Sequence, residues 1–439
     1  MAIETQDNVL AVPTMPHKCN PVASASPFEV LDKYKTFQDI HQKTWWEKTG
    51  PLLSKVLVSA NYSLERQFEA LIFYREILLP FMGPYPQTFR SAITRSGLPI
   101  EFSVNYQQCG DTEPVVRIGF EPVLVASGSE ADLYNQKPIS LLLDQLKRLN
   151  ISGFDTSLLE HFLERHTLSA SERAKLAQRE MVGSDLTSQC AFGFDLKPGA
   201  MSVKGYTFPA LKCHASGMDF GVVIAESVDS IKNQVGYFPS FDMVNDYMKE
   251  TNGYSKVAFW SWDCVKPTSS RLKLYSSSND VFWPKIEQIW TLGGRVNTPT
   301  VKKGLEYLSQ LWSVTKVAEG RRDFTGGFDD GKDSTPTPMV WNYEMQPGNS
   351  IPLTKFYFPI HGENDHKIIR GIAQFLVDIG LTKLGESYEK TVQDYFPDRN
   401  IHNTARLTSW ISFAYTEKTG VYLSVYYHSS SDYPWAEDV

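Results

Sequence analysis

Cations and tyrosines share one face of several short strand-like segments. Arg271, Lys273 and Tyr275 alternate with Leu272 and Leu274. The same phase recurs in three further pairs, Lys204 with Tyr206, Lys355 with Tyr357, and Tyr422 with Tyr426. Residues two apart in a strand point to the same side of a sheet. In a closed barrel ringed by helices the aliphatic residues would face the helices, and the cations and phenols would line a polar lumen suited to an oligophosphate.

The alternative is that these are exposed strand faces whose charges form ordinary surface salt bridges. Burying an unpaired cation costs on the order of several kcal/mol, so a site in the interior must contain water or hold an anion. The common phase in several strands favours the shared lumen. If diphosphate is a leaving group, the tyrosine rings have a second use, because each π face stabilises a carbocation by ~1–2 kcal/mol when desolvated.

One acidic residue stands out against this basic set. Glu101 shares its strand face with Ser103 and Asn105. In an otherwise basic lumen its carboxylate would accept a hydrogen bond from an N–H, and an indole N–H is suited to this because it is a donor only. The contact would orient the indole and raise its nucleophilicity. The spacing supports equally well an alternative in which Glu101 balances Arg117 across the hairpin.

Other motifs argue against metal and nucleotide chemistry. Residues 329–333 read DDGKD, but they lie in a Gly-rich segment rather than on a helix, so no metal site is expected there. His161 and His166 are five apart without an HExxH motif, which disfavours a zinc protease site. The chain contains no GxxxxGK[ST], GxGxxG or GxSxG motif, so P-loop, Rossmann and hydrolase functions are excluded.

The composition is that of an ordinary globular protein. The 439 residues carry a net charge of −7, which gives no support to binding of nucleic acid or of a membrane surface. Five scattered cysteines without a CxxC motif suit a reducing, cytoplasmic environment. We find no apolar run of 18 residues and no secretory signal pattern at the N-terminus.

Helical and strand-like segments alternate in five rounds of helices followed by a strand pair. The predicted strand pairs are 100–106 with 115–125, 190–196 with 201–212, 256–265 with 270–276, 339–345 with 354–360, and 409–415 with 421–428. The predicted helices begin near Pro27 and include 63–81, 136–149, 156–181, 228–251, 281–290, 298–316, 366–380 and 384–396. A further strand is possible over Phe220–Glu226, and residues 319–338 are expected to form a long surface loop.

The strand pairs read as hairpins, so the sheet should be antiparallel. Ten strands without a free edge predict an α+β fold, in which a ten-stranded antiparallel barrel with a solvent-filled lumen is surrounded by helices. We expect residues 1–27 to be a flexible arm and residues 28–439 to be a single domain.

From about residue 30 to its C-terminus the chain resembles the fungal aromatic prenyltransferases of the dimethylallyltryptophan synthase family. The resemblance rests on GPYP, SGLPIEFSVNY, VRIGFEP, FDLK followed by VKGYTFP, WTLGGR, RLKLY, KFYFP and SWISFAYTEKTGVYLSVYYH. It implies the same helix-ringed barrel, and that Glu101 holds the indole N–H. It also implies that ten residues bind the diphosphate and shield the allyl cation, namely Arg117, Lys204, Tyr206, Arg271, Lys273, Tyr275, Lys355, Tyr357, Tyr422 and Tyr426.

The resemblance further implies that dimethylallyl diphosphate is the co-substrate and that no cofactor or metal is needed. Members that act on free tryptophan have a lysine where this chain has Ala191, and a larger side chain at Gly119 would narrow the pocket. Both positions indicate a tryptophan-containing cyclic dipeptide like cyclo-Trp-Pro, prenylated in reverse orientation at indole C2 in alkaloid biosynthesis. The chain would act as a monomer or homodimer. The alternatives are another aromatic acceptor (free tryptophan, tyrosine or a phenol) or a non-catalytic binder of isoprenoid diphosphates.

Overall fold

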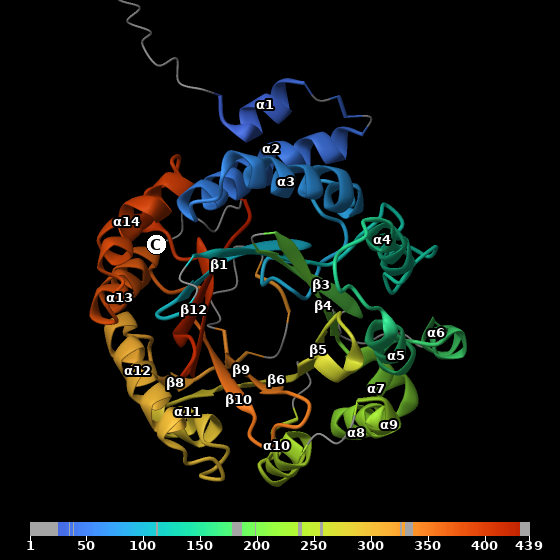
Figure 1. The fold of residues 1–439 in the computed structure, drawn as a ribbon. Coiled ribbons are helices and arrows are strands. Elements are labelled where there is room, and N and C mark those ends of the chain that lie inside the picture. The colour runs from blue at the N-terminus through green and yellow to red at the C-terminus, as the bar shows by residue number, and fades with distance from the viewer. Residues whose placement is uncertain are drawn as a thin grey trace, which may run out of the picture.

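The computed structural model describes residues 25–34, 36–37, 39–110, 113–177, 187–197, 199–235, 239–254, 258–324, 327–329 and 337–430. Within these ranges a closed β-barrel lies inside a ring of helices (Figure 1). Nearly all of the expected N-terminal arm, residues 1–27, lies outside the described ranges, and Pro27 already belongs to the first helix. The single-domain boundary at residue 28 stays a prediction.

Ten strands of the described chain form the barrel in the order β1-β12-β11-β10-β9-β6-β5-β4-β3-β2, with every neighbouring pair antiparallel. The last strand pairs with the first, so that Phe102 lies opposite Tyr427 and no barrel edge is left open. The barrel strands are β1 (Ile100–Gln107), β2 (Val115–Phe120), β3 (Cys190–Lys197), β4 (Ala200–Thr207), β5 (Phe259–Asp263), β6 (Leu272–Ser278), β9 (Met339–Met345), β10 (Leu353–Phe358), β11 (Thr408–Thr416) and β12 (Gly420–Tyr427). A separate two-stranded sheet pairs β7 (Asp280–Val281) with β8 (Gly320–Arg321).

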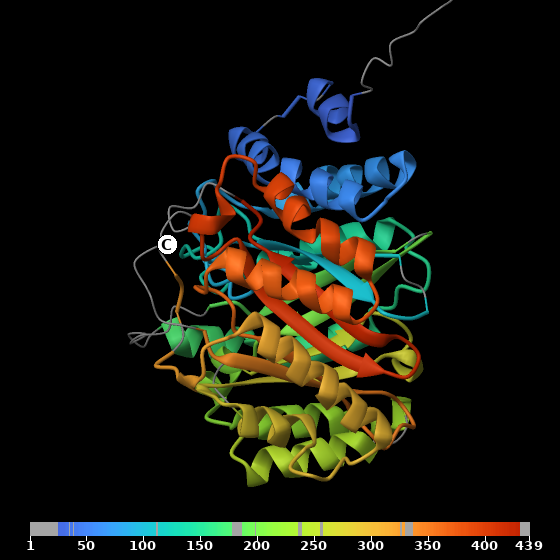
Figure 2. The same ribbon diagram turned by 90° about the vertical axis from the view of Figure 1, so that its left-hand side faces the viewer.

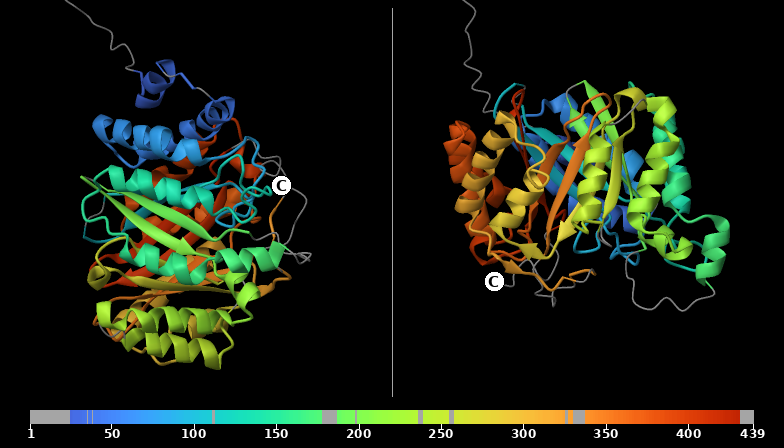
Figure 3. Two further views of the ribbon diagram at one scale, coloured as in Figure 1. Left: turned by 90° about the vertical axis from the view of Figure 1, so that its right-hand side faces the viewer. Right: turned by 90° about the horizontal axis from the view of Figure 1, so that it is seen from below.

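Helices surround the barrel on all sides when it is viewed along its axis, and the side views show them running alongside the strands (Figures 1, 2 and 3). They are α1 (Pro27–Lys33), α2 (Ile40–Ser59), α3 (Leu64–Phe73), α4 (Lys137–Arg148), α5 (Ser157–His166), α6 (Ala170–Ala177), α7 (Ala210–Ser216), α8 (Phe220–Ser230), α9 (Lys232–Val235), α10 (Pro239–Glu250), α11 (Trp283–Trp290), α12 (Pro299–Thr315), α13 (Asp365–Asp378) and α14 (Thr382–Tyr395). The short turns are η1 (Tyr74–Leu78), η2 (Leu79–Phe81), η3 (Pro267–Ser269) and η4 (Ile401–Asn403). Each round of helices is followed by one strand pair, as the sequence predicts. No helix within the described ranges has both the length and the apolar character needed to cross a membrane.

The helix ring closes between its first and last members. Tyr395 at the end of α14 shares a hydrogen bond with the Ser59 hydroxyl at the end of α2, and Lys55 on α2 donates to the Tyr395 carbonyl. Helix starts are fixed locally by side chains. Ser26 and Glu29 form a reciprocal capping box at α1, and Asn364 accepts from the Lys367 amide at α13.

The strands have their aliphatic face outward, as the sequence predicts. Leu272, Leu274 and Phe356 are at most 1% exposed and belong to the large apolar core between barrel and helices. The core also holds Trp262, which approaches β4 so closely that a Cβ at Gly205 would lie 2.3 Å from its ring. Glycine is therefore the residue that lets this strand pass beneath the indole.

The possible strand over Phe220–Glu226 is wrong, because this segment is the start of helix α8. Asp219 has extended backbone angles and precedes the first helical residue. Val223, Ile224 and Val228 are buried at helical spacing. A short apolar run does not distinguish a strand from a buried helix by its composition, and here the run continues for three turns.

Two predicted strands are too long, and one predicted loop is misplaced. After Phe120 the chain leaves the barrel, since Pro122 has no amide to donate. After Thr207 the chain turns at Pro209 into α7. The segment 319–338 is not simply a surface loop, because Asp329 and Thr337 are 1% and 0% exposed.

Candidate functional site

The inward side chains of the barrel form two layers along its axis. Inward residues alternate along each strand, so neighbouring strands place residues of similar depth opposite one another. Tyr206 lies opposite Ala191, whereas Lys204, two residues earlier, lies opposite Gly193. The lumen therefore contains a layer of tyrosines and, next to it, a layer of cations.

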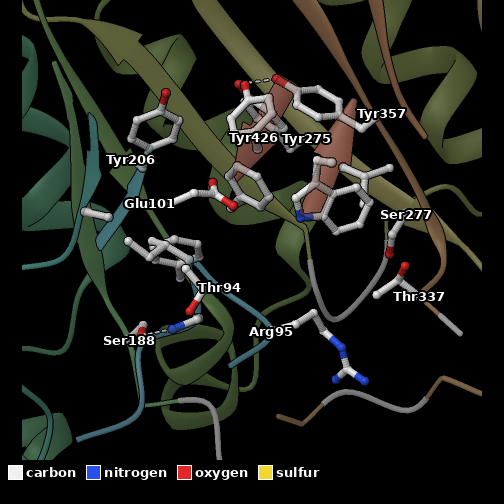
Figure 4. A pocket seen from close by; sticks show the side chains of 18 of the residues that line it. Thr94, Arg95, Glu101, Ser188, Tyr206, Tyr275, Ser277, Thr337, Tyr357 and Tyr426 are labelled. Atoms are coloured by element: carbon white, nitrogen blue, oxygen red, sulfur yellow. Dashed lines mark hydrogen bonds between the residues drawn. The ribbon is translucent and has the colours of Figure 1, made fainter. Parts of the chain in front are cut away.

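The tyrosine layer consists of Tyr206, Tyr275, Tyr357 and Tyr426, one from each of four strands. The centroids of successive rings are 6.3, 5.9 and 6.2 Å apart, and the hydroxyls of Tyr275 and Tyr357 are 3.4 Å apart. Burial raises the pKa of each of these phenols, so they are neutral hydrogen-bond donors. Their aromatic faces and hydroxyls border one cavity (Figure 4).

The basic layer holds the five predicted cations, Arg117, Lys204, Arg271, Lys273 and Lys355. Lys273 is 5% exposed and Arg117 is 9% exposed, so these two charges are largely removed from solvent, whereas the Arg271 side chain is 36% exposed. Arg117 donates to the hydroxyls of Tyr422 and Ser424. The Lys355 Nζ lies 4.6 Å from the centroid of the Tyr422 ring. Tyr422 thus belongs to the basic layer rather than to the tyrosine layer.

Three carboxylates in this layer were not predicted from the sequence. The Asp195 Oδ1 lies 3.2 Å from the Arg117 Nε and 2.5 Å from the Lys204 Nζ. Asp263 lies 2.5 Å from the Arg271 Nε and 3.0 Å from the Lys273 Nζ, and Glu344 lies 3.2 Å from an Arg271 Nη. The expectation of an otherwise basic lumen is therefore wrong, because barrel closure requires counter-charges for cations packed this closely.

These carboxylates are ionised. Burial by itself would raise their pKa values, but the neighbouring cations outweigh it and hold the pKa of each below its ordinary value. When all five cations of the described lumen are protonated, they face three charged carboxylates in the basic layer, which leaves an excess of two positive charges. An anionic ligand such as a diphosphate balances this excess.

Two of the lysines hold their protons weakly in the free protein. Burial lowers the pKa of Lys204 to about 8, with Asp195 opposing the shift and Arg117 adding to it. Burial and the charge of Arg117 place the pKa of Lys355 well below its ordinary value. A bound diphosphate favours the charged form of both lysines, so its binding is coupled to protonation.

Glu101 lies in the wall of the cavity, opposite Gly119 on β2. Its Oε1 accepts a hydrogen bond of 2.7 Å from the Ser409 hydroxyl, and burial raises its pKa to about 8 against that bond. Arg117 is paired with Asp195, and we find no contact between Glu101 and Arg117 among the described residues. Glu101 is therefore held by one neutral donor, and its second oxygen can accept a hydrogen bond from a ligand.

The cavity measures about 270 Å³ and lies between the tyrosine layer and the segments at one end of the barrel. Its apolar lining includes Ile93, Phe208, Phe259, Phe328, Val340 and Trp410. Figure 4 shows Thr94, Ser188, Arg95 and Thr337 across the cavity from Glu101 and the tyrosines. An apolar cavity with a few hydroxyls suits a flat, largely neutral ligand.

Gly119 and Ala191 both line this cavity, as their predicted role requires. A Cβ at Gly119 would lie 3.9 Å from the Cβ of Glu101, so a small side chain fits but a longer one would reach into the space beside Glu101. Ala191 lies opposite Tyr206, beside the tyrosine layer. Because both residues are small, there is room beside the Glu101 carboxyl group for an N–H group of a ligand.

A buried carboxylate outside the predicted set fixes part of the cavity wall. Glu121 is fully buried and accepts hydrogen bonds from the hydroxyls of Ser91 and Ser188 and from the amide of Asn135. Ser188 in turn accepts from the Ala92 amide, and Ser188 and Ala92 both line the cavity. Burial raises the pKa of Glu121 to about 7. Its position directly after β2 gave no signal of this role, since it depends on contacts from distant segments.

The groups set aside as metal ligands have structural partners. Asp329 accepts from Arg406 and contacts His361, and it is 1% exposed. The rest of the DDGKD motif, residues 330–333, lies outside the described ranges. His166 is buried between the hydroxyls of Thr207 and Ser227, and burial lowers its pKa to about 3.

The chain is similar to known proteins over most of its length. The family model for tryptophan dimethylallyltransferase matches residues 41–391. Prenyltransferase phqI of Penicillium fellutanum is 60% identical over 430 residues, which is 93% of each chain. Deoxybrevianamide E synthase of Aspergillus versicolor is 45% identical over 96% of this chain and 98% of its own. The crystal structure of NotF in complex with brevianamide F and DMSPP has a TM-score of 0.83 at 43% identity, covering 93% of this chain and 100% of NotF.

Replacing Glu101 by Gln should stabilise the protein at alkaline pH. The unfolded chain releases this proton near the ordinary pKa of 4.5, whereas the folded protein keeps it up to about 8. Stability from this group is therefore lost as the pH rises between these values. The Tm of E101Q should exceed that of the wild type by an amount that grows from pH 5 to pH 8 and then levels off, on the order of a few °C.

Glu130→Gln provides the control for this measurement, because Glu130 is an exposed carboxylate. Its Tm should follow that of the wild type across the same pH range. A difference between E101Q and the wild type that is constant with pH would contradict the buried, proton-retaining state of Glu101.

Diphosphate binding should depend on the charge of Lys204. The variant Lys204→Arg stays charged at all working pH values, while the wild type loses this charge through about pH 8. The affinity of each protein for inorganic diphosphate is measured by calorimetry. We expect the ratio of the wild-type affinity to the K204R affinity to fall about tenfold between pH 7 and pH 9. Using the ratio removes the titration of the ligand itself, and a flat ratio would contradict the lowered pKa of Lys204.

Proposed function

The chain belongs to the tryptophan dimethylallyltransferase family, and we propose that it transfers a dimethylallyl group to the indole ring of a tryptophan-containing cyclic dipeptide. It is a prenyltransferase, so the non-catalytic alternative is set aside. One observation carries the proposal. The carboxyl group of Glu101, which is hydrogen-bonded to the neutral hydroxyl of Ser409, faces the same cavity as the four tyrosines. The tyrosine layer lies next to the basic layer.

The basic layer is suited to hold the diphosphate of dimethylallyl diphosphate. Diphosphate binding favours the charged forms of Lys204 and Lys355, so the excess positive charge is in place before the bond breaks and little reorganisation accompanies that step. The bond between the allylic carbon and oxygen breaks with both electrons going to the diphosphate. Arg117, Lys204 and Lys355 then stabilise the charge that develops on this leaving group, and the Tyr422 hydroxyl lies beside them.

The tyrosine layer is suited to protect the allyl cation. The four phenols stand between the diphosphate site and the acceptor cavity, and burial keeps them neutral. Their π faces stabilise a cation by ~1–2 kcal/mol each when desolvated, and their packing excludes water that would capture it. Phe259 stacks on Tyr275 at 4.1 Å and extends this aromatic wall.

Glu101 is proposed to bind the indole N–H through the oxygen that Ser409 does not occupy. Attack by an indole carbon forms the new carbon–carbon bond and places positive charge on the ring. Glu101 stabilises this charge in its carboxylate form, which becomes the major form as the pH rises through about 8. Loss of the ring proton to a base or to water restores aromaticity. Most of the acceleration would come from orientation and preorganised charge.

The cavity favours a cyclic dipeptide over free tryptophan. A cyclic dipeptide has no charged amino or carboxylate group, and the lining offers it the hydroxyl of Thr337, which is buried without a hydrogen-bond partner among the described residues. Arg95, the cation of this lining, donates to the Gly327 carbonyl and lies over Phe324. We propose cyclo-Trp-Pro as the test substrate and reverse attachment at C2 as its outcome. Deoxybrevianamide E synthase, to which this chain is 45% identical, is in keeping with this choice.

We also propose that transfer needs no metal. The charge that a metal would supply to the diphosphate is present in the guanidinium and ammonium groups of the basic layer. Asp329, the described residue of the DDGKD motif, is committed to Arg406 and His361.

Glu101→Ala should abolish turnover while leaving the fold intact. Without the Glu101 carboxyl group, the indole N–H loses its hydrogen-bond acceptor and the ring is no longer oriented. The rate of prenyl transfer to cyclo-Trp-Pro should therefore fall by a factor on the order of a hundred or more. Inorganic diphosphate should bind as before. Product mass, measured for cyclo-Trp-Pro, free tryptophan, tyrosine and a simple phenol, identifies the acceptor class, and NMR of the product assigns the attachment site.

Glu130→Ala is the matched control, since it removes an exposed carboxylate. Near-normal activity of E101A would refute the role of Glu101. A wild-type preference for free tryptophan or a phenol would refute the cyclic-dipeptide assignment.

Gly119→Leu should discriminate between acceptors of different size. The added side chain would fill space next to Glu101, where the structure leaves 3.9 Å to the nearest Cβ. We expect kcat/KM for cyclo-Trp-Pro to fall at least about tenfold more than that for a small indole such as indole-3-propionate, since a lost fit costs about 1–3 kcal/mol. Equal losses for both acceptors would contradict a role of Gly119 in pocket size.

A further inference from the structure

Two histidines and a glutamate gather on the outside of the helix ring, away from the lumen. His366 is at the start of α13, Glu389 is in the middle of α14, and His402 is in η4. Their ligand-type atoms all lie within 4.8 Å of one another, and the His366 Nε2 is 3.2 Å from the Glu389 Oε1. The imidazole centroids of His366 and His402 are only 3.8 Å apart.

We propose that His366, Glu389 and His402 form a binding site for a zinc-like divalent transition-metal ion. Zinc binds histidine nitrogen and carboxylate oxygen at about 2.0–2.2 Å in tetrahedral geometry, so two ligand atoms of one ion are about 3.3 Å apart. The separation between His366 and Glu389 already matches this value. Two imidazoles and one carboxylate select zinc, nickel or copper over calcium and magnesium, which prefer oxygen ligands. Solvent supplies the fourth ligand at this partly exposed position.

The backbone around these ligands is already fixed. Helices α13 and α14 pack so closely that a Cβ at Gly385 would lie 2.5 Å from the Ala373 carbonyl oxygen. Glu389 is four residues after Gly385 and therefore lies on the helix face that meets α13. The carbonyl of His402 accepts a 3.1 Å hydrogen bond from the Asn364 side chain, and Asn364 is the residue that caps α13. Metal binding thus needs side-chain adjustment alone.

Neighbouring charges limit the affinity without preventing binding. Lys367 and Arg370 line the same surface hollow. Lys367 is neutralised by Glu363 at 2.8 Å. Lys316 also lines this hollow, and because Lys316 and Arg370 repel a metal ion, we expect a dissociation constant in the micromolar range rather than the nanomolar range.

The ion would link α13, α14 and η4, and α13 is hydrogen-bonded to the segment that positions Glu101. Next to His366, the buried Asp365 accepts hydrogen bonds from the backbone amides of Leu407 and Thr408. The following residue, Ser409, is the hydrogen-bond donor to Glu101. In Figure 2 helices α13 and α14 face the viewer outside the barrel, so the ion does not touch the reacting groups. Its role is to stabilise the fold rather than to take part in prenyl transfer.

The test uses the tag-free, full-length protein after treatment with EDTA and dialysis. Titration with zinc chloride, followed by calorimetry, should show one saturable site with a micromolar dissociation constant. The variant H402A removes an exposed ligand and should therefore keep the fold. The variant H366A removes the second imidazole. Each variant should bind zinc at least tenfold more weakly. Zinc should raise the Tm of the wild type and leave that of H402A unchanged.

His214→Ala is the matched control, because His214 is an exposed histidine of α7 outside the cluster. It should bind zinc as the wild type does. Absence of a saturable site near one equivalent, or equal affinity in the wild type, H402A and H366A, would overturn the proposal. Prenyl transfer at 25 °C should be the same with EDTA and in H402A. If EDTA or H402A abolishes transfer, the ion is more than a structural clamp, and the proposal in this form is refuted.

Discussion

The structure depends on keeping five cations inside a barrel. Charges removed from water are stable only when opposite charges and hydrogen bonds replace the lost hydration. Asp195, Asp263 and Glu344 provide part of this replacement through direct ion pairs. When Lys204 and Lys355 are protonated, an excess of positive charge remains, and a bound anion balances it. The ring of helices follows from the same constraint, because a polar lumen forces the apolar strand faces outward, where helices must cover them.

The tyrosine layer divides the lumen into two environments. On one side the ion-pair network holds charge in a fixed arrangement, and on the other side the cavity is apolar with a few hydroxyls. Phenols are suited to this boundary, since each has an apolar body with one polar end. Glu101 lies on the apolar side, and its raised pKa records that difference in environment.

The sequence was sufficient for the architecture because the inward phase repeats in strand after strand. The cations, the tyrosines and the aliphatic outer face all follow from period-two alternation. Asp263 and Glu344 share that phase, but each stands near the end of a hydrophobic run, where single carboxylates usually face solvent. The bond from Ser409 to Glu101 could not be predicted, because the two residues are 308 positions apart and meet only through barrel closure and a bulge near Thr408. The role of Glu121 could not be predicted for the same reason, because its hydrogen-bond partners come from three separate segments.

The pairing of the first barrel strand with the last one has a consequence for folding. Phe102 meets Tyr427 only after nearly the whole chain has been made, so β1 keeps an open edge throughout synthesis. Contacts of such long range make folding slow, and they expose partly formed sheets to wrong pairing. In the finished fold the early helices α2 and α3 lie outside the barrel beside β1 (Figure 1). A closed lumen, and with it the proposed site for an allylic diphosphate, requires that β12 pair with β1.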